Sequence, residues 1–107
     1  MEIKKLKDFF RGWIIGNFEP SLFKTKDFEV GIIVHKKGEK WPVHYHKLAI
    51  EYNVLIFGKM KINGVDISAG DIFIIEKNEI SDSQFIEDCT ILCLKVPSVI
   101  GDKYEVL

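Results

Sequence analysis

The sequence of this 107-residue chain predicts an all-β fold, an antiparallel sandwich or barrel, in a single domain over residues 1–107. Short runs rich in β-branched and aromatic residues follow one another from residue 13 onward, and turn residues separate them. Between two of these runs stands Asn63-Gly64, the dipeptide most typical of a tight β-hairpin turn. With 47% hydrophobic residues, the chain can close one compact core but is too short for two ordinary domains.

The N-terminal segment predicts one short helix, followed by strands. Within residues 3–11, Ile3, Leu6, Phe9 and Phe10 recur close to the helical period, and Gly12 follows as a stop. Strands are then expected at 13–18, 28–35, 39–46, 48–57, 59–62, 65–67, 71–76 and 90–96. Because no repeat or linker separates them, these strands are expected to share one sandwich or barrel.

The charge balance narrows the class of protein. Fifteen Lys and Arg residues against sixteen Asp and Glu leave a net charge of -1, and the basic residues are spread along the chain, which argues against nucleic-acid or membrane-surface binding. No apolar run approaches the roughly 20 residues that span a bilayer, and the N-terminus lacks a signal-peptide pattern, so a cytoplasmic protein is expected. Cys89 and Cys93 would lie about 13 Å apart on one strand, too far for a disulfide, and are interpreted as buried thiols.

Two histidines form the most informative local pattern. His44 and His46 are two residues apart, so on an extended strand both imidazoles point to the same face. Glu51 follows His46 by five residues, an odd spacing, and can join the histidines only if the chain bends near residues 47–49 and returns on a neighbouring strand. Two neutral imidazoles and one carboxylate form a ligand set suited to Fe(II) and usable by Zn, Mn or Ni.

An isolated His-x-His pair is more often a polar patch than a metal site, but here the pair stands in a wider frame. Gly38, His44, His46, Glu51 and Gly58 have the spacing Gly-x5-His-x-His-x4-Glu-x6-Gly, which resembles the first signature motif of the cupin superfamily at every fixed position. The resemblance implies a small jelly roll. It also implies that His44, His46 and Glu51 converge inside it on one divalent metal ion.

The second cupin motif is only half present. The stretch beginning at Gly70 is in register, but Glu76 stands where the motif has Pro, Asn78 where it has Gly, Ser81 where it has the ligand His, and Phe85 where it has Asn. Asn tolerates a left-handed backbone, so Asn78 is expected to preserve the turn. Ser81 removes the fourth protein ligand, and a hydroxyl is a poorer donor than imidazole. The metal is therefore expected to bind more weakly than in a four-ligand cupin.

Two functional hypotheses stay open at this stage. Cupins include dioxygenases, isomerases, decarboxylases, storage proteins and sensing domains, so the resemblance does not choose a reaction. In the first hypothesis, a divalent ion (Fe, Mn, Ni or Zn) acts beside a small polar ligand, sugar-like or a carboxylate, in a possible metalloenzyme. In the second, the protein is a metal-free, non-catalytic binding or sensing cupin whose histidines only hydrogen-bond the ligand. No catalytic residue is assigned.

The two faces of the strand that contains Glu51 differ in polarity, and this pattern predicts an oligomer. If Glu51 points into the barrel, the opposite face, with Leu48, Ile50, Tyr52, Val54 and Ile56, points outward and needs a cover. Another sheet, the N-terminal segment or a second subunit could provide it, and we expect a homodimer. Among the remaining polar residues, His35 is expected to be an exposed histidine at a strand end, and Lys95 is expected to face solvent.

Overall fold

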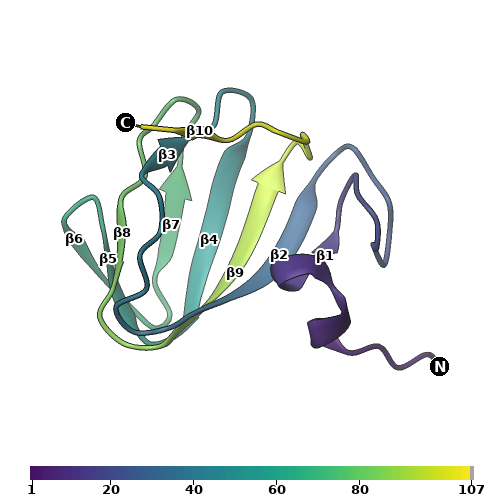
Figure 1. Cartoon of the computed structure of the whole chain (residues 1–107), viewed down its shortest axis with the longest axis horizontal. Coiled ribbons are helices and arrows are strands. Elements are labelled where there is room, and N and C mark those ends of the chain that lie inside the picture. The colour runs from purple at the N-terminus through teal and green to yellow at the C-terminus, as the bar shows by residue number, and fades with distance from the viewer. Residues whose placement is uncertain (107) are drawn as a thin grey trace.

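The computed structural model describes residues 1–106, and its regular secondary structure is almost entirely β-strand, as predicted (Figure 1). The strands are β1 (Trp13–Ile15), β2 (Glu29–His35), β3 (His44–Tyr45), β4 (Ile50–Phe57), β5 (Lys59–Ile62), β6 (Val65–Ser68), β7 (Ile72–Ile75), β8 (Ser83–Phe85), β9 (Cys89–Val96) and β10 (Tyr104–Glu105).

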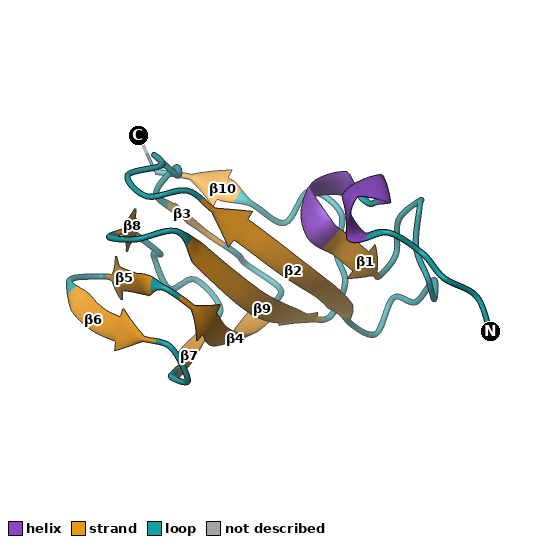
Figure 2. Ribbon diagram, turned by 90° about the horizontal axis from the view of Figure 1, so that it is seen from below, coloured by secondary structure: helices purple, strands orange, loops and turns teal. Residues whose placement is uncertain are grey.

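Three antiparallel sheets make up the fold. The largest has the order β1-β2-β9-β4-β7, a second has the order β6-β5-β8, and β10 pairs with β3 in a two-stranded sheet. In both ribbon views the three-stranded sheet lies at the end of the molecule opposite the N-terminus (Figures 1 and 2). Strands distant in sequence pair in this arrangement, as in the long β2–β9 and β9–β4 ladders.

The core lies between the large sheet and the three-stranded sheet. The inward positions of β4 and β9 alternate with exposed ones, as expected for strands with one buried face. Eight residues from six strands form the buried hydrophobic cluster: Leu55, Met60, Ile62, Ile67, Ile75, Phe85, Cys89 and Ile91. Both cysteines are buried and free, as predicted.

The two predicted turn positions are confirmed by their backbone angles. Asn63 and Gly64 have φ values of 51° and 78°, and they join β5 to β6. Positive φ at both central residues is the geometry of the type I′ turn, which matches the twist of a hairpin. Asn78 has φ 64°, so it preserves the left-handed position for which glycine is more usual.

The predicted N-terminal helix is wrong. Only two single 3-10 turns form, η1 (Leu6–Asp8) and η2 (Phe10–Gly12), and no α-helix occurs within residues 1–106. Phe9 lies between the turns with extended φ and ψ of -102° and 148°, which interrupts helical propagation. Both turns lack fully buried residues, so no packed apolar face offsets the unfavourable nucleation of so short a helix. No helix in the described part of the chain is long and apolar enough to cross a membrane.

Strand bounds also differ from the prediction near the histidines. Instead of residues 39–46, the strand β3 contains only His44 and Tyr45, and Pro42, which has no backbone N–H to donate, precedes it. Two strands, β8 and β10, have no counterpart in the prediction. β10 is a two-residue strand that forms only because it meets β3, with Glu105 opposite His44.

Candidate metal centre

The chain between the histidines and Glu51 bends as the spacing required, and Asp102 holds the bend. One carboxylate oxygen of Asp102 accepts a hydrogen bond from the backbone N–H of Lys47 at 2.9 Å, and the other accepts from Leu48 at 3.0 Å and Ala49 at 2.9 Å. Burial raises the pKa of Asp102, but these three backbone donors outweigh burial and lower it below its ordinary value. The ionised carboxylate therefore fixes the turn that leads from β3 into β4.

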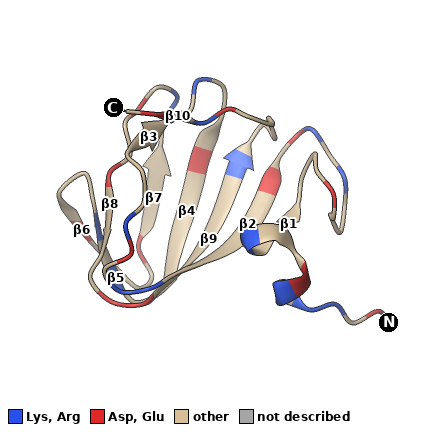
Figure 3. Ribbon diagram, in the orientation of Figure 1, with Lys and Arg blue, Asp and Glu red and all other residues tan. Residues whose placement is uncertain are grey.

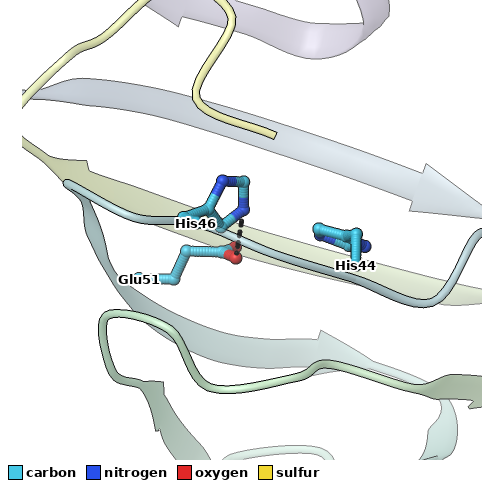
Figure 4. Close-up of side chains that lie close together, drawn as sticks. All are labelled: His44, His46 and Glu51. Carbon is cyan, nitrogen blue, oxygen red and sulfur yellow. Dashed lines mark ion pairs between the residues drawn. The ribbon is translucent and has the colours of Figure 1, made fainter. Parts of the chain in front are cut away.

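This bend brings the three predicted residues together. The candidate ligand atoms of His44, His46 and Glu51 all lie within 4.8 Å of one another. His44 and His46 are buried, and Figure 4 shows the His46 imidazole and the Glu51 carboxylate pointing toward each other. Glu51 reaches this position from β4, while the histidines come from β3 and the residue that follows it.

Both imidazoles are held with the same nitrogen turned toward the site. His44 donates from Nδ1 to the carbonyl oxygen of Pro42 at 2.8 Å, and His46 donates from Nδ1 to the carbonyl oxygen of Asp102. A carbonyl only accepts, so each Nδ1 carries a proton, and in a neutral imidazole Nε2 is then left with a lone pair. Histidines that bind metals are usually oriented in this way, through a hydrogen bond from the nitrogen that is not a ligand.

The Nε2 atom of His46 provides a test of whether a metal fits. It is buried without a hydrogen-bond partner, although Oε2 of Glu51 lies 3.0 Å away. At this distance a lone pair on Nε2 and an ionised carboxylate repel each other, so the pair needs a positive charge, either a bound cation or, in metal-free protein, a proton on Nε2. Two ligand atoms about 2.1 Å from one metal and at right angles to each other would be about 3.0 Å apart. The donor set therefore fits a divalent ion.

The ionisation states of the site also suit a cation. Burial acts to raise the pKa of Glu51, but contact with His46 and the charge of Lys95 outweigh it and lower that pKa to about 2. Burial lowers the pKa of His44, which favours the neutral imidazole that a metal requires. Cys93 donates from Sγ to Oε1 of Glu51 at 3.3 Å, and burial, together with the Glu51 charge, raises the pKa of this thiol. Cys93 is thus a protonated thiol that orients Glu51.

Ser81 stands beside His44, at the position where the cupin motif has its fourth ligand. The two residues form a β-bridge, in which Ser81 N–H donates to the His44 carbonyl at 2.8 Å and His44 N–H donates back at 3.2 Å. Ser81 is buried and lines the same cavity as His44 and Glu51. Its side chain is smaller than imidazole, so the wall of the cavity is open at the place of the missing ligand.

The site opens into two adjoining cavities. One, of about 250 Å³, is lined by His44, Glu51 and Ser81 together with side chains of the core. The other, of about 400 Å³, is lined by His46 and Asp102. Four residues, namely Phe10, Trp13, Lys95 and Lys103, line both cavities. The η2 turn and the segment before β10 therefore form part of the wall.

Two expectations about single residues are wrong. His35 is buried rather than exposed: its ring stacks on Phe85 at 4.1 Å, packs edge-on against Trp41 at 5.1 Å, and Nδ1 contacts Glu39. It lines the cavity but is not among the three clustered candidate ligands. The strand end is covered because Trp41 and Phe85 converge on it from elsewhere in the chain.

Lys95 is half-buried and lines the cavities instead of facing solvent. It lies two residues after Cys93 and four after Ile91, both buried, so the period of a strand puts it on the inner face of β9. This signal was present in the sequence. No local sequence pattern marked Asp102, because its side chain accepts hydrogen bonds from residues 47–49, which are more than 50 positions away.

No protein-family model matches the sequence, and no curated protein matches it. Solved structures do match. An uncharacterised conserved protein from Klebsiella pneumoniae with a double-stranded β-helix domain is 18% identical, with a TM-score of 0.71 over 97% of this chain and 90% of that one. A pirin from Escherichia coli, in complex with nickel(II), is 20% identical, with a TM-score of 0.67 over 82% of this chain and 39% of the pirin.

The Cnp3 cupin domain of Schizosaccharomyces pombe is 19% identical, with a TM-score of 0.62 over 72% of this chain and 61% of that domain. At these identities the likeness concerns the fold alone, and it agrees with the fold that the histidine motif predicted. The chain has the double-stranded β-helix fold of the cupins.

Proposed function

We propose that the protein binds one divalent metal ion through Nε2 of His44, Nε2 of His46 and the carboxylate of Glu51, and that it takes a small polar ligand into the adjoining cavity. The observation that carries the proposal is the buried Nε2 of His46, which faces Glu51 at 3.0 Å without a hydrogen bond. The nickel(II) complex of the pirin supports it as a precedent for metal binding in this fold.

The surrounding residues have distinct roles in this proposal. Asp102 positions both the bend and the His46 ring, and Cys93 orients Glu51. A bound divalent ion would supply Lewis-acid polarisation of a ligand oxygen. Ser81 leaves space in the wall next to His44, where water or ligand atoms could complete the metal shell. Catalysis is a separate question from binding, because the fold does not select a reaction.

Metal titration of the wild-type protein tests the proposal. The protein should be purified without a histidine tag and freed of metal, then titrated calorimetrically with Fe(II), Mn(II), Ni(II) and Zn(II). We expect one ion per chain, and we expect His46→Ala to abolish binding. His35→Phe is the matched control, because His35 is equally buried and stacks on Phe85, but lies outside the ligand cluster.

The second candidate function is metal-free binding of a small molecule. It is favoured by Ser81, which replaces the fourth ligand, and by the His46–Glu51 separation, which also fits an imidazolium paired with a carboxylate. In that case the histidines would hydrogen-bond the ligand directly. Absence of metal binding in the wild type, or binding that survives His46→Ala, would make this second function the better one.

A further inference from the structure

Three basic side chains converge on the cavity beside the candidate metal centre. The guanidinium carbon of Arg11 lies 5.5 Å from the centre of the Trp41 ring, and Nζ of Lys103 lies 4.3 Å from the same ring. Nζ of Lys95 lies 4.9 Å from the centre of the Trp13 ring. All five residues line this cavity. Such contacts hold the flexible cationic side chains against rigid aromatic surfaces.

These cations come from three parts of the chain. Arg11 belongs to η2, Lys95 to β9, and Lys103 to the segment before β10. Figure 3 shows the basic position on β9 beside acidic positions on β4 and β2. Lys95 pairs in register with Glu51 on one side and with Glu29 on the other. The grouping is therefore made by the tertiary structure, and nothing in the local sequence marks it.

The backbone holds Arg11 in place. Arg11 has φ 52°, a left-handed conformation that residues other than glycine rarely adopt. Gly12 follows with φ 83°, and a Cβ there would lie 2.0 Å from the carbonyl oxygen of Ile32. The η2 turn thus sits directly against β2, and this close contact fixes the direction from which Arg11 reaches the cavity.

The three cations lie at different depths: Arg11 and Lys103 are exposed, and Lys95 is half-buried. Within residues 1–106, Arg11, Lys95 and Lys103 come within 4.0 Å of no carboxylate oxygen, since the ion pairs there involve other basic residues. Glu51 is the carboxylate that lines this cavity, against three cations, whereas Glu19, Glu29 and Asp102 line the adjoining cavity together with Lys95 and Lys103. Burial, followed by the charge of Lys95, lowers the pKa of Lys103, as expected where like charges are close together. A divalent metal on Glu51 would increase the positive excess.

The remaining wall has a polar part, which includes Asn53, Ser81 and Ser83, and an apolar part. Ile33, Met60, Phe73, Ile75 and Ile91 line the cavity, whose volume is about 250 Å³. A neutral sugar-like molecule would leave the three cations without a counter-charge. A small organic anion supplies one, because its charged end can meet the cations while its apolar part meets the hydrocarbon side chains of the wall.

We propose that the ligand of this protein is a small organic carboxylate, recognised by Arg11, Lys95 and Lys103 at the wall of the cavity. This inference rests on the proposed function, because the same cavity contains His44 and Glu51. Arg11 supplies a planar fork of donors that suits a carboxylate, and the lysines supply point charges. These three residues are specificity-determining residues for the charge of the ligand.

Paired probes of equal shape test the charge preference. Butyrate and butyramide, and benzoate and benzamide, differ by one charge at nearly constant size. Each is titrated calorimetrically into metal-free protein and into metal-loaded protein, and inorganic phosphate is titrated in the same way. We expect each carboxylate to bind at least about ten-fold more tightly than its amide in both forms of the protein. Equal affinity of acid and amide would overturn the proposal.

Substitutions at the cavity wall locate the preference. Arg11→Gln and Lys103→Gln should each weaken butyrate binding to metal-free protein by about three- to ten-fold, and should leave butyramide binding unchanged. Lys47→Gln is the matched control, because Nζ of Lys47 also lies over an aromatic ring, that of Tyr104 at 4.2 Å, but Lys47 lines neither cavity. If Arg11→Gln and Lys103→Gln behave like this control, the carboxylate site is wrong.

The outcomes separate this inference from the metal proposal. The inference would be overturned if carboxylates bound only to metal-loaded protein and if Arg11→Gln and Lys103→Gln left that binding unchanged. The metal alone would then attract the anion. Phosphate that binds as tightly as butyrate, with the same dependence on Arg11, would replace the organic carboxylate by a general anion. If the protein binds no metal but still prefers carboxylates to amides, the metal centre is refuted. Arg11, Lys95 and Lys103 would then remain as the recognition site.

Discussion

Removal of the Asp102 carboxylate is expected to damage both the stability of the fold and the metal centre. Asp102 is buried, and its side chain accepts hydrogen bonds from the backbone N–H groups of Lys47, Leu48 and Ala49. These donors form the bend that carries the chain from His46 to Glu51. Asp102→Ala leaves the three groups without their acceptor, and Asp102→Asn keeps a single carbonyl oxygen in the same place.

The expected loss of unfolding free energy follows from how exposed the three N–H donors are. Lys47 and Leu48 lie at exposed positions, so water can replace the carboxylate there at a cost of about 0.5–1 kcal/mol each. Ala49 is 3% exposed, and an unpaired buried N–H costs about 1–3 kcal/mol. We therefore expect Asp102→Ala to lower the free energy of unfolding by about 3 kcal/mol, and Asp102→Asn to lower it by less.

The same change should weaken metal binding. The expected loss of metal affinity is about ten-fold, the lower end of the effect of removing a residue that orients metal ligands, because the carbonyl oxygen that orients His46 stays in place. Equilibrium unfolding in urea measures the first effect, and calorimetric titration with Ni(II) or Zn(II) measures the second. Asp102→Asn serves for the titration, since the milder change is the safer one for folding. Asp66→Ala is the control, because Asp66 is an exposed aspartate whose ion pair with Lys61 is 3.8 Å long.

One result would refute this reasoning. If Asp102→Ala unfolds at the same urea concentration as Asp66→Ala and binds metal like the wild type, the bend does not depend on the carboxylate. The convergence of His46 and Glu51 would then need another cause.

Three further predictions concern affinity, pH and assembly. Ser81→His should tighten metal binding by at least about ten-fold in calorimetry, because position 81 lines the cavity beside His44, and unchanged affinity would contradict this. Glu51 has an ordinary pKa of 4.5 and a pKa of about 2 in the folded protein, so about 3 kcal/mol of stability should be present above pH 4.5 and be lost as the pH falls toward 2. Urea unfolding of metal-free protein should show this loss, and Glu51→Gln should remove it. We also propose a homodimer, because Tyr52 and Ile74 are 40% and 48% exposed and pair across neighbouring strands on the outer sheet face. Light scattering should give twice the monomer mass, and Ile74→Lys should give the monomer.

The sequence by itself determined the elements whose information is local. The alternation of strands put His44 and His46 on one face, and Asn63-Gly64 specified a hairpin because both residues tolerate positive φ. The cupin-like spacing predicted the fold and the identity of the three clustered residues, and Ser81 marked the missing ligand. Even the inward position of Lys95 follows from the period-two pattern with Cys93, although we expected it to face solvent.

Only the tertiary structure decided how these elements meet. Glu51 joins the histidines because Asp102, more than 50 residues later, holds the intervening bend. His35 is buried because Trp41 and Phe85 cover the end of β2, and Arg11 and Lys103 meet over Trp41 from the two ends of the chain. The physical reason is the same in each case. A long-range hydrogen bond or ring contact forms only after distant segments have packed. The local pattern of residues therefore does not predict it.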